Sequence, residues 1–298
     1  MSKRFIIVDT GIAPTKEFIE KYDLEVMGMQ IIMDDEEFLD YHEVDKSDFF
    51  KKIQTANEFH TAHPSIGEIA KIYETLKEKG ASEILEIHFS SKMTGLVNTC
   101  KLAKDMVNET YKDLKINIID TENISIGGYF VAEKCVELYS AGKSYEEILE
   151  ILPEIKSSSF IQFTVPNLKY LIKNGRVGKA EGLAGTLLNI KPILGVDDAL
   201  IAPINKVRGM KKVILMMHDN AIKFLENRRN NIKIYVTYGL DENIDEMNRL
   251  KEMLLETMNY KGMNDYKIIE NRLDPTIACH SGPEVVGLAV YGEKEPIY

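Results

Sequence analysis

The sequence predicts an α/β protein of two domains, an N-terminal doubly wound parallel sheet and a C-terminal α+β domain. Three observations support this prediction. The chain has 298 residues, and a globular domain averages roughly 150 residues. In the first half, short apolar runs alternate with helix-type segments, which is typical of a parallel sheet. After about residue 156, hairpin-like runs mix with helices, so we expect domains at residues 1–157 and 158–298.

The N-terminal half begins with a fully apolar run, Phe5–Val8, which ends at a polar Asp-Thr-Gly loop and predicts a buried parallel strand. Further along, Ser65 and Glu68 form a capping-box pattern that starts a helix, and Gly80 is a typical helix stop. The other expected elements are, in order, a helix from about Pro14, a strand within Leu24–Met33, an acidic loop or hairpin edge at Asp34–Asp40, helices at Lys46–Thr55 and Ser65–Lys79, a strand at Glu83–Phe89, a helix at Leu96–Asn108, a strand at Ile116–Ile119 and a helix at Ile126–Ser140.

The C-terminal half contains two apolar runs, Ile190–Val196 and Ala199–Ile204, separated by two aspartates that are typical of a hairpin turn. Mixed hairpins and helices favour an α+β arrangement. The other expected elements are a strand at Phe160–Val165, a short helix, a Gly-rich stretch at Asn174–Gly185, a helix at about Met210–Asn227, a strand at Lys233–Thr237, a helix at about Ile244–Thr257 and strands near Tyr266–Glu270 and at Val285–Tyr291.

Charge and hydrophobicity exclude several classes of protein. The net charge of −10 argues against nucleic-acid binding, which needs a basic face. The longest apolar stretch has about eight residues, whereas a membrane helix needs roughly 18–20. The N-terminal apolar run is too short for a signal peptide. We therefore expect a cytoplasmic protein with no membrane span and no nucleic-acid partner.

Motifs for common cofactors and metals are missing from the sequence. It contains no Gly-x-Gly-x-x-Gly after a strand, no P-loop, no Gly-x-Ser-x-Gly and no His-Glu-x-x-His. The three cysteines are far apart and form no Cys-x-x-Cys, so we expect buried, reduced thiols. His60 and His63 lie three residues apart with His42 upstream, but no carboxylate stands at a spacing that would complete a metal site. We expect no cofactor and no metal.

Two hydroxyl-rich segments are candidates for binding an anion. Thr61 stands just before the helix that Ser65 caps, where free N–H groups and the helix dipole favour negative charge. Ser90–Gly95, which includes Ser91 and Thr94, joins an expected strand to an expected helix, and such loops bind ligands in open α/β sheets. The structural alternative is that these residues only cap helices.

Two further residues lie in glycine-containing segments. Arg176 stands between Gly175 and Gly178, where the backbone approaches a ligand easily and a guanidinium suits a carboxylate or phosphate. His280 begins a His-Ser-Gly-Pro segment that reads as a loop, from which an imidazole can reach a cleft and titrate near neutrality. The alternatives are a solvated arginine in a turn and a structural histidine.

Taken together, these segments resemble the DegV family of bacterial fatty-acid-binding proteins over essentially the whole chain. Asp9-Thr10 stands where the family has Asp-Ser, and the departures include His63 for a Gln and Glu284 for a Gly. The matching segments are Thr61–Ser65 for Thr-Ser-Gln-Pro-Ser, Ser90–Gly95 for Ser-Ser-x-Leu-Ser-Gly, Leu168–Val177 for Leu-x-x-Gly-Gly-Arg-Ile, Leu187–Leu194 for the Lys-Pro-Ile-Leu segment and His280–Gly287 for His-x-Gly-Pro-Gly.

The resemblance implies two α/β domains with a long-chain fatty acid in a tunnel and its carboxylate at the surface end. Thr61 and Thr94 would hydrogen-bond the carboxylate, and Arg176 and His280 would lie near it and assist phosphoryl transfer. The same site would include Ser65, Ser91 and Gly95. A separate catalytic subunit of a fatty acid kinase would bring ATP and form the acyl phosphate, so this chain would be a lipid-binding subunit and not an enzyme.

The same residues also allow an alternative hypothesis, that the protein is an independent enzyme. In that reading His280 acts as a base and Arg176 holds a small anionic metabolite. A co-purifying fatty acid would distinguish the two readings.

Overall fold

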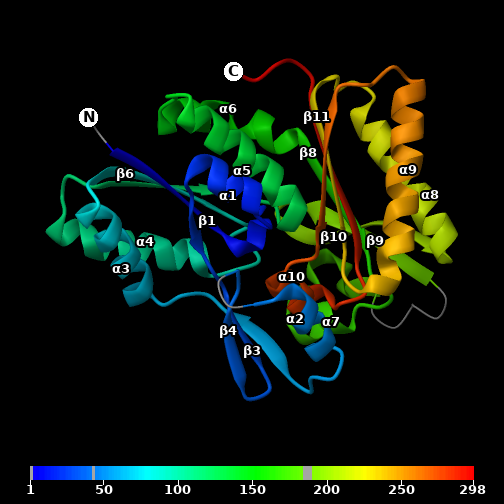
Figure 1. The fold of residues 1–298 in the computed structure, drawn as a ribbon, viewed down its shortest axis with the longest axis horizontal. Coiled ribbons are helices and arrows are strands. Elements are labelled where there is room, and N and C mark those ends of the chain that lie inside the picture. Colours follow the sequence, from blue (N-terminus) through cyan, green and yellow to red (C-terminus); the bar gives the residue numbers. More distant parts are fainter. Residues whose placement is uncertain (1–2, 42–43, 184–189) are drawn as a thin grey trace.

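The computed structural model describes residues 3–41, 44–183 and 190–298, whose strands form three sheets (Figure 1). The first sheet is parallel throughout, as predicted, and its strand order is β2 (Glu25–Met27), β1 (Lys3–Asp9), β6 (Ala81–His88) and β7 (Lys115–Asp120). Because the chain runs outward from β1 in both directions, the crevice between the ends of β1 and β6 is a topological switch point.

Helices cover both faces of this parallel sheet. The helices α3 (Ile66–Glu78) and α4 (Leu96–Thr110) pack together on one face (Figure 1). The other face carries η1 (Thr10–Ile12), α1 (Lys16–Tyr22) and α5 (Ser125–Ser140). This arrangement is the doubly wound architecture that the sequence predicted.

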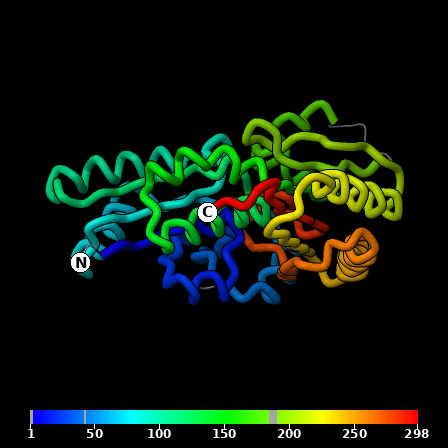
Figure 2. The backbone as a smooth tube through the Cα atoms, turned by 90° about the horizontal axis from the view of Figure 1, so that it is seen from above, coloured from blue at the N-terminus to red at the C-terminus, as the bar shows by residue number. Residues whose placement is uncertain are grey.

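The second sheet is mixed, and only its β11–β12 pair is parallel among the described residues. Its strand order is β10 (Leu200–Arg208), β9 (Ile190–Asp197), β8 (Ser159–Thr164), β13 (Val286–Glu293), β11 (Asn230–Tyr238) and β12 (Tyr266–Arg272). The helices α8 (Met210–Leu225) and α9 (Ile244–Tyr260), the latter preceded by η3 (Asp241–Asn243), cover one face. Figure 2 shows these elements at one end of an elongated molecule and the parallel sheet at the other.

The helix α5 lies between the two larger sheets. It contacts β6 of the first sheet and β8, β11 and β13 of the second. Its residues from Ser125 to Val136 are all buried, including Glu133 and Lys134, which pair with charged residues of the second sheet. It therefore ties the two sheets into one core.

A small antiparallel sheet, not foreseen as such, lies beside the crevice. Its strand order is β4 (Glu36–Leu39), β3 (Gln30–Met33) and β5 (Phe59–Ala62). The single strand expected within Leu24–Met33 was wrong, because the chain divides it into β2 and β3 at Gly28. A Cβ atom on Gly28 would lie 2.5 Å from the Asp40 carbonyl oxygen, so the close approach requires glycine.

Short helices complete the fold around the crevice. They are α2 (Lys46–Lys52), α7 (Lys169–Lys173), η2 (Gly178–Leu183) and α10 (Pro275–Ser281). Three elements were not predicted from the sequence, namely β5, α6 (Tyr145–Ser157) and α10. The loop predicted at His280 was wrong, because His280 lies in the last turn of α10. The proposed boundary at residue 157 falls between α6 and β8. His42, residues 184–185 and residues 187–189 of the predicted segments lie outside the described residues.

Candidate functional site

A cavity of about 410 Å³ opens at the switch point, between the parallel sheet and the mixed sheet. Loops that follow β2, β6 and β7 line one side of it, and strands β8, β11 and β13 line the other. Most of its wall is apolar, including Met29, Phe89, Ile126, Ile161, Phe163, Leu171, Leu273, Ile277 and Val285. Its volume lies in the range of small-molecule sites, about 300–1,000 Å³.

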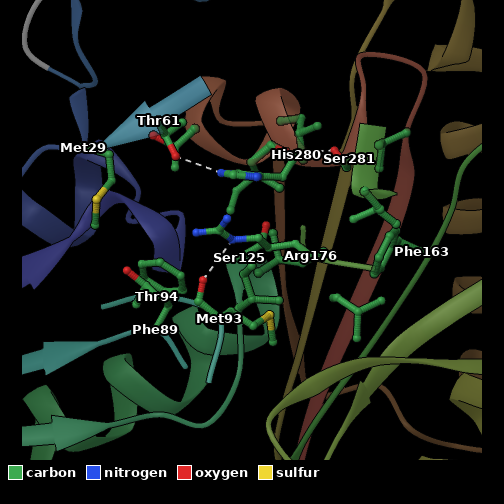
Figure 3. Close-up of a pocket in the computed structure, with 18 of the residues that line it drawn as sticks. Met29, Thr61, Phe89, Met93, Thr94, Ser125, Phe163, Arg176, His280 and Ser281 are labelled. Carbon is green, nitrogen blue, oxygen red and sulfur yellow. Dashed lines mark hydrogen bonds between the residues drawn. The ribbon is translucent and has the colours of Figure 1, made fainter. Parts of the chain in front are cut away.

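The polar residues gather in one part of this cavity. Figure 3 shows Thr61, His280 and Arg176 pointing toward one another, with Phe163 at some distance on the opposite side. Thr61 comes from β5, Arg176 follows α7, and His280 comes from α10. An apolar cavity with a small polar cluster suits an amphipathic ligand with one polar end.

Thr61 and His280 form a direct hydrogen bond although 219 positions separate them in sequence. Thr61 Oγ1 lies 2.8 Å from His280 Nε2. Burial, together with the nearby Arg176 guanidinium, lowers the pKa of His280 to about 4. The imidazole is therefore neutral at pH 7, and its buried Nδ1 has no hydrogen-bond partner among the described residues.

The neutral imidazole has two tautomers, and they give Thr61 different roles. If the proton is on Nε2, His280 donates to Thr61, and the threonine hydroxyl keeps its own hydrogen for a ligand. If the proton is on Nδ1, Thr61 donates to His280 instead. An anionic ligand favours the first tautomer, because it offers an acceptor to the Thr61 hydroxyl.

Arg176 is positioned by the end of α7. Gly175 adopts a left-handed conformation with φ of +68°, and the Arg176 N–H donates to the Leu171 carbonyl at 2.8 Å, as in a Schellman cap. The guanidinium donates to the Met93 carbonyl at 3.2 Å and the Asn174 carbonyl at 2.7 Å. Two of its five N–H donors are used in this way within the described residues, and the others remain for a ligand.

The loop between β6 and α4 supplies a second hydroxyl. Thr94 Oγ1 accepts a hydrogen bond from the Leu96 N–H at 3.2 Å, so its hydrogen is available for donation into the cavity. Gly95 follows, and a Cβ atom there would lie 3.0 Å from His63 Nε2. The glycine therefore lets the His63 ring come close to the loop.

Five of the predicted site residues meet in this cavity, namely Thr61, Thr94, Gly95, Arg176 and His280. Ser91 instead lines an adjacent depression of about 280 Å³, next to Lys92 and Gly178. Ser65 is exposed and lines neither of these two pockets, because its hydroxyl and N–H bond the Glu68 carboxylate at the start of α3. We therefore do not retain Ser65 as a ligand residue.

Several lining residues were missed as site residues. His63 was considered only as a metal ligand and as a departure from the family, yet it lines the cavity just after β5, while His60 within β5 is exposed. Ser125 lines it with a φ of +50°, a strained conformation for a residue other than glycine. No sequence pattern marks Ser125, because its place depends on how α5 follows β7.

A family model described as "Uncharacterised protein, DegV family" matches residues 3–293. The chain belongs to the DegV family. A DegV domain-containing protein of Clostridium acetobutylicum is 31% identical to it, with 98% of this chain and 100% of that protein covered.

Solved DegV structures share the fold. The structure of a fatty-acid-binding DegV family protein from Thermus thermophilus has a TM-score of 0.86 at 25% identity, covering 97% of this chain and 99% of that one. A stearic acid-binding protein from Eubacterium ventriosum has a TM-score of 0.85 at 24% identity, with both chains fully covered, and this likeness concerns the fold.

Two positions that entered the family resemblance can now be placed in the structure. The carboxylate of Asp9, in the Asp-Thr pair, accepts hydrogen bonds from the Gly11 and Phe89 N–H groups, which links the ends of β1 and β6. Glu284 replaces a family glycine but is not among the residues that line the cavity.

Among the described residues, no helix has the length and apolarity needed to cross a bilayer.

Proposed function

We propose that this chain binds one long-chain fatty acid, with the carboxylate at Thr61 and Thr94 and the acyl chain along the apolar wall. The observation that carries the proposal is the gathering of hydroxyl, imidazole and guanidinium groups at one part of an otherwise apolar cavity. Fatty-acid binding by the related Thermus protein supports it. No metal or cofactor is needed at this site, because hydrogen-bond donors and Arg176 compensate the carboxylate charge.

The acyl chain supplies the main driving force. Burial of a methylene group gains about 0.8 kcal/mol, so a chain of about 16 carbons gains roughly 12 kcal/mol before costs are counted. Ordering of the tail and loss of free motion offset part of this gain. The carboxylate contacts then fix which end of the lipid faces the polar cluster.

We propose further that the bound acid is presented in the cytoplasm to a separate kinase subunit, which forms the acyl phosphate from ATP. The exposed Arg176 and the depression at Ser91 and Lys92 lie next to the proposed carboxylate position. Positioning and charge stabilisation dominate phosphoryl transfer, and these residues supply both. The chain itself would then be a binding subunit.

The enzyme reading receives less support from the geometry. A general base works best with a pKa near the working pH, whereas burial lowers the pKa of His280 to about 4. The large apolar wall also exceeds what a small anionic metabolite would use.

Mass spectrometry of an organic extract of the purified protein tests the binding proposal. We expect a fatty acid in the extract, and saturable one-to-one binding when delipidated protein is titrated calorimetrically. Delipidated, folded protein without saturable acyl binding would overturn the proposal.

Kinase presentation needs its own experiment, with a cognate kinase subunit and ATP. We expect His280→Ala and Arg176→Ala to reduce acyl phosphate formation more than acyl affinity, because contacts made in the transition state appear in the rate. Equal loss of acyl affinity and of acyl phosphate formation would show that His280 and Arg176 have no separate role in phosphoryl transfer. Acyl phosphate made by this chain alone would identify it as the kinase.

A further inference from the structure

Two charged or titratable side chains occupy the interior of the parallel sheet. Glu86 and His88 lie in β6, a central strand, and both are 0% exposed. Central parallel strands are normally continuous apolar runs. The two residues are two positions apart, so their side chains share one face of the sheet. Cys100 of α4, also 0% exposed, packs against the same face.

The donor atoms of these three residues converge. His88 Nε2 lies 3.3 Å from Glu86 Oε2 and 3.5 Å from Cys100 Sγ, and the three donor atoms all lie within 4.8 Å of one another. A tetrahedral zinc ion with bonds of about 2.0–2.3 Å separates nitrogen from oxygen by about 3.3 Å and nitrogen from sulfur by about 3.6 Å. Both contacts of the imidazole therefore have the spacing of ligands around one ion.

The histidine is oriented from its other side by a carboxylate. His88 Nδ1 lies 2.9 Å from Asp9 Oδ2, and Asp9 is itself held by the N–H groups of Gly11 and Phe89. A metal-bound histidine almost always donates its second N–H to such an acceptor, which fixes the tautomer and leaves Nε2 for the metal.

One buried oxygen of the cluster has no partner. Glu86 Oε1 is completely enclosed and has no hydrogen bond among the described residues, whereas buried carboxylate oxygens are normally paired. Tyr73 lies beside this carboxylate, and burial together with the Glu86 charge raises the pKa of Tyr73, but its hydroxyl donates to the Cys100 carbonyl at 3.4 Å. Glu86 Oε1 is thus placed to be a fourth donor through bidentate coordination.

We propose that Glu86, His88 and Cys100 bind a divalent transition-metal ion, zinc by preference, in a closed structural site. A mixed set of one thiolate, one imidazole and one carboxylate suits zinc, whereas magnesium and calcium require oxygen ligands throughout. The site lies inside the N-terminal sheet, and none of its residues lines the lipid cavity. The ion would join α4 to β6, the two elements that flank the loop with Thr94 and Gly95.

The metal-free alternative is an ion triad. Burial alone lowers the pKa of His88, but hydrogen bonds with Asp9, Cys100 and Glu86 raise it well above its usual value. In that metal-free state the His88 imidazolium bridges the carboxylates of Asp9 and Glu86, and Cys100 remains a thiol. The two states differ in metal content and in the ionisation of Cys100.

Elemental analysis of the full chain tests the proposal, after expression in zinc-supplemented medium and exhaustive dialysis. We expect about one zinc per chain in the wild type and at least about tenfold less in Cys100→Ser and in Glu86→Gln. Cys135→Ser is the matched control, because Cys135 is equally buried but lies in α5 outside the cluster. Thr61→Val, which alters only the lipid site, should keep its zinc.

Two further measurements cover the possibility that a variant fails to fold. Cobalt-loaded wild type and Cys135→Ser should show thiolate-to-cobalt charge-transfer absorption, and folded Glu86→Gln should show it weakened. Asp9→Asn should weaken zinc affinity by about 10–100-fold in a chelator competition. A wild type without zinc and without the cobalt band overturns the proposal, as does folded Cys100→Ser with wild-type zinc content.

Discussion

At the scale of single residues, the proposed lipid site depends on two hydroxyl groups from distant parts of the chain. Thr61 is fixed by its hydrogen bond with His280, and Thr94 by the bond that it accepts from Leu96. Thr94 can still donate one hydrogen bond to a carboxylate, and Thr61 can do so when the His280 proton is on Nε2. The polar end of the cavity is thus arranged before a ligand arrives, which reduces the entropy cost of binding.

Replacement of these hydroxyls should weaken lipid binding. We expect Thr61→Val and Thr94→Val each to cost about 1.5–3 kcal/mol of acyl binding free energy, because each removes a donor to a charged oxygen. The double variant should deviate from additivity, since in the proposed complex both residues would contact one carboxylate. Calorimetry with delipidated protein measures both effects.

Ser65→Ala is the control for these variants. Ser65 caps α3 outside the cavity, so this change should cost about 1 kcal/mol of folding stability and leave acyl affinity unchanged. Wild-type affinity in both folded threonine variants would remove Thr61 and Thr94 from the site.

His280 should take up a proton when the lipid binds. Burial and Arg176 lower the pKa of His280 to about 4, below the unfolded value of about 6.5. The neutral imidazole of His280 therefore contributes to folding stability above pH 6.5, and this contribution is lost as the pH falls through 4. A carboxylate beside the ring raises this pKa again, so affinity should increase as the pH falls from 7 toward 5.

Calorimetry in buffers with different ionisation enthalpies measures this proton uptake. His280→Gln should abolish it, because the amide does not titrate but can still bond Thr61. His63→Gln is the matched control, since His63 faces the same cavity. Uptake that persists in His280→Gln and disappears in His63→Gln would assign the proton to His63.

At the scale of elements, α10 is a short helix whose N-terminus is bonded by a residue from a distant part of the chain, Asp40. It spans Pro275–Ser281, and the Asp40 carboxylate accepts hydrogen bonds from both the N–H and the hydroxyl of Thr276. A negative charge at a helix N-terminus is favourable. This contact fixes the helix that carries His280 into the cavity.

Ionised Asp40 should nevertheless reduce folding stability. Burial, with the Asp274 charge nearby, raises the pKa of Asp40 to about 6. The folded state therefore holds the Asp40 proton more tightly than the unfolded state, and stability is lost as the pH rises from about 4 to about 6. The expected loss is about 3 kcal/mol relative to Asp40→Asn, whose amide cannot ionise.

Urea denaturation of the wild type and Asp40→Asn at several pH values measures this difference. Any cost of the amide itself is independent of pH and does not alter the slope. A constant difference between pH 4 and pH 7 would show that the Asp40 pKa is not raised.

At the scale of the whole molecule, buried ion pairs join α5 to the mixed sheet. Lys233 of β11 bonds Glu133 at 2.8 Å, and Lys134 bonds Glu293 of β13 at 3.0 Å. All four side chains are less than one tenth exposed. Since α5 also packs on β6, these pairs help to set how the two sheets face each other across the cavity.

Loss of one partner should be costly for the whole fold. We expect Lys233→Met to destabilise the protein by about 3–5 kcal/mol, because Glu133 would remain buried without its main counter-charge. The double variant Lys233→Met/Glu133→Gln should recover part of this loss. Chemical denaturation measures the free energy of unfolding of both variants. A double variant no more stable than the single one would contradict the prediction that unpaired Glu133 causes the loss.

Local patterns in the sequence determined most of the secondary structure and the family. Alternation of strands and helices predicted the parallel sheet, and the capping pattern at Ser65 placed the start of α3, because both depend on residues near one another in the chain. Five separated motifs indicated the DegV family, and the family model confirms it. Thr61, Thr94, Gly95, Arg176 and His280 were chosen from these motifs, and they line one cavity.

Contacts between distant segments were decided only by the tertiary structure. The expectation of no metal site rested on local spacings, and the proposed zinc cluster escapes such a search because Cys100 comes from a helix packed on β6. Likewise, β5 forms by pairing with β3, and α10 depends on Asp40. A local sequence pattern indicates periodicity and helix caps. The proposed metal cluster, β5 and α10 depend instead on which buried side chains and strands meet after the sheets have packed.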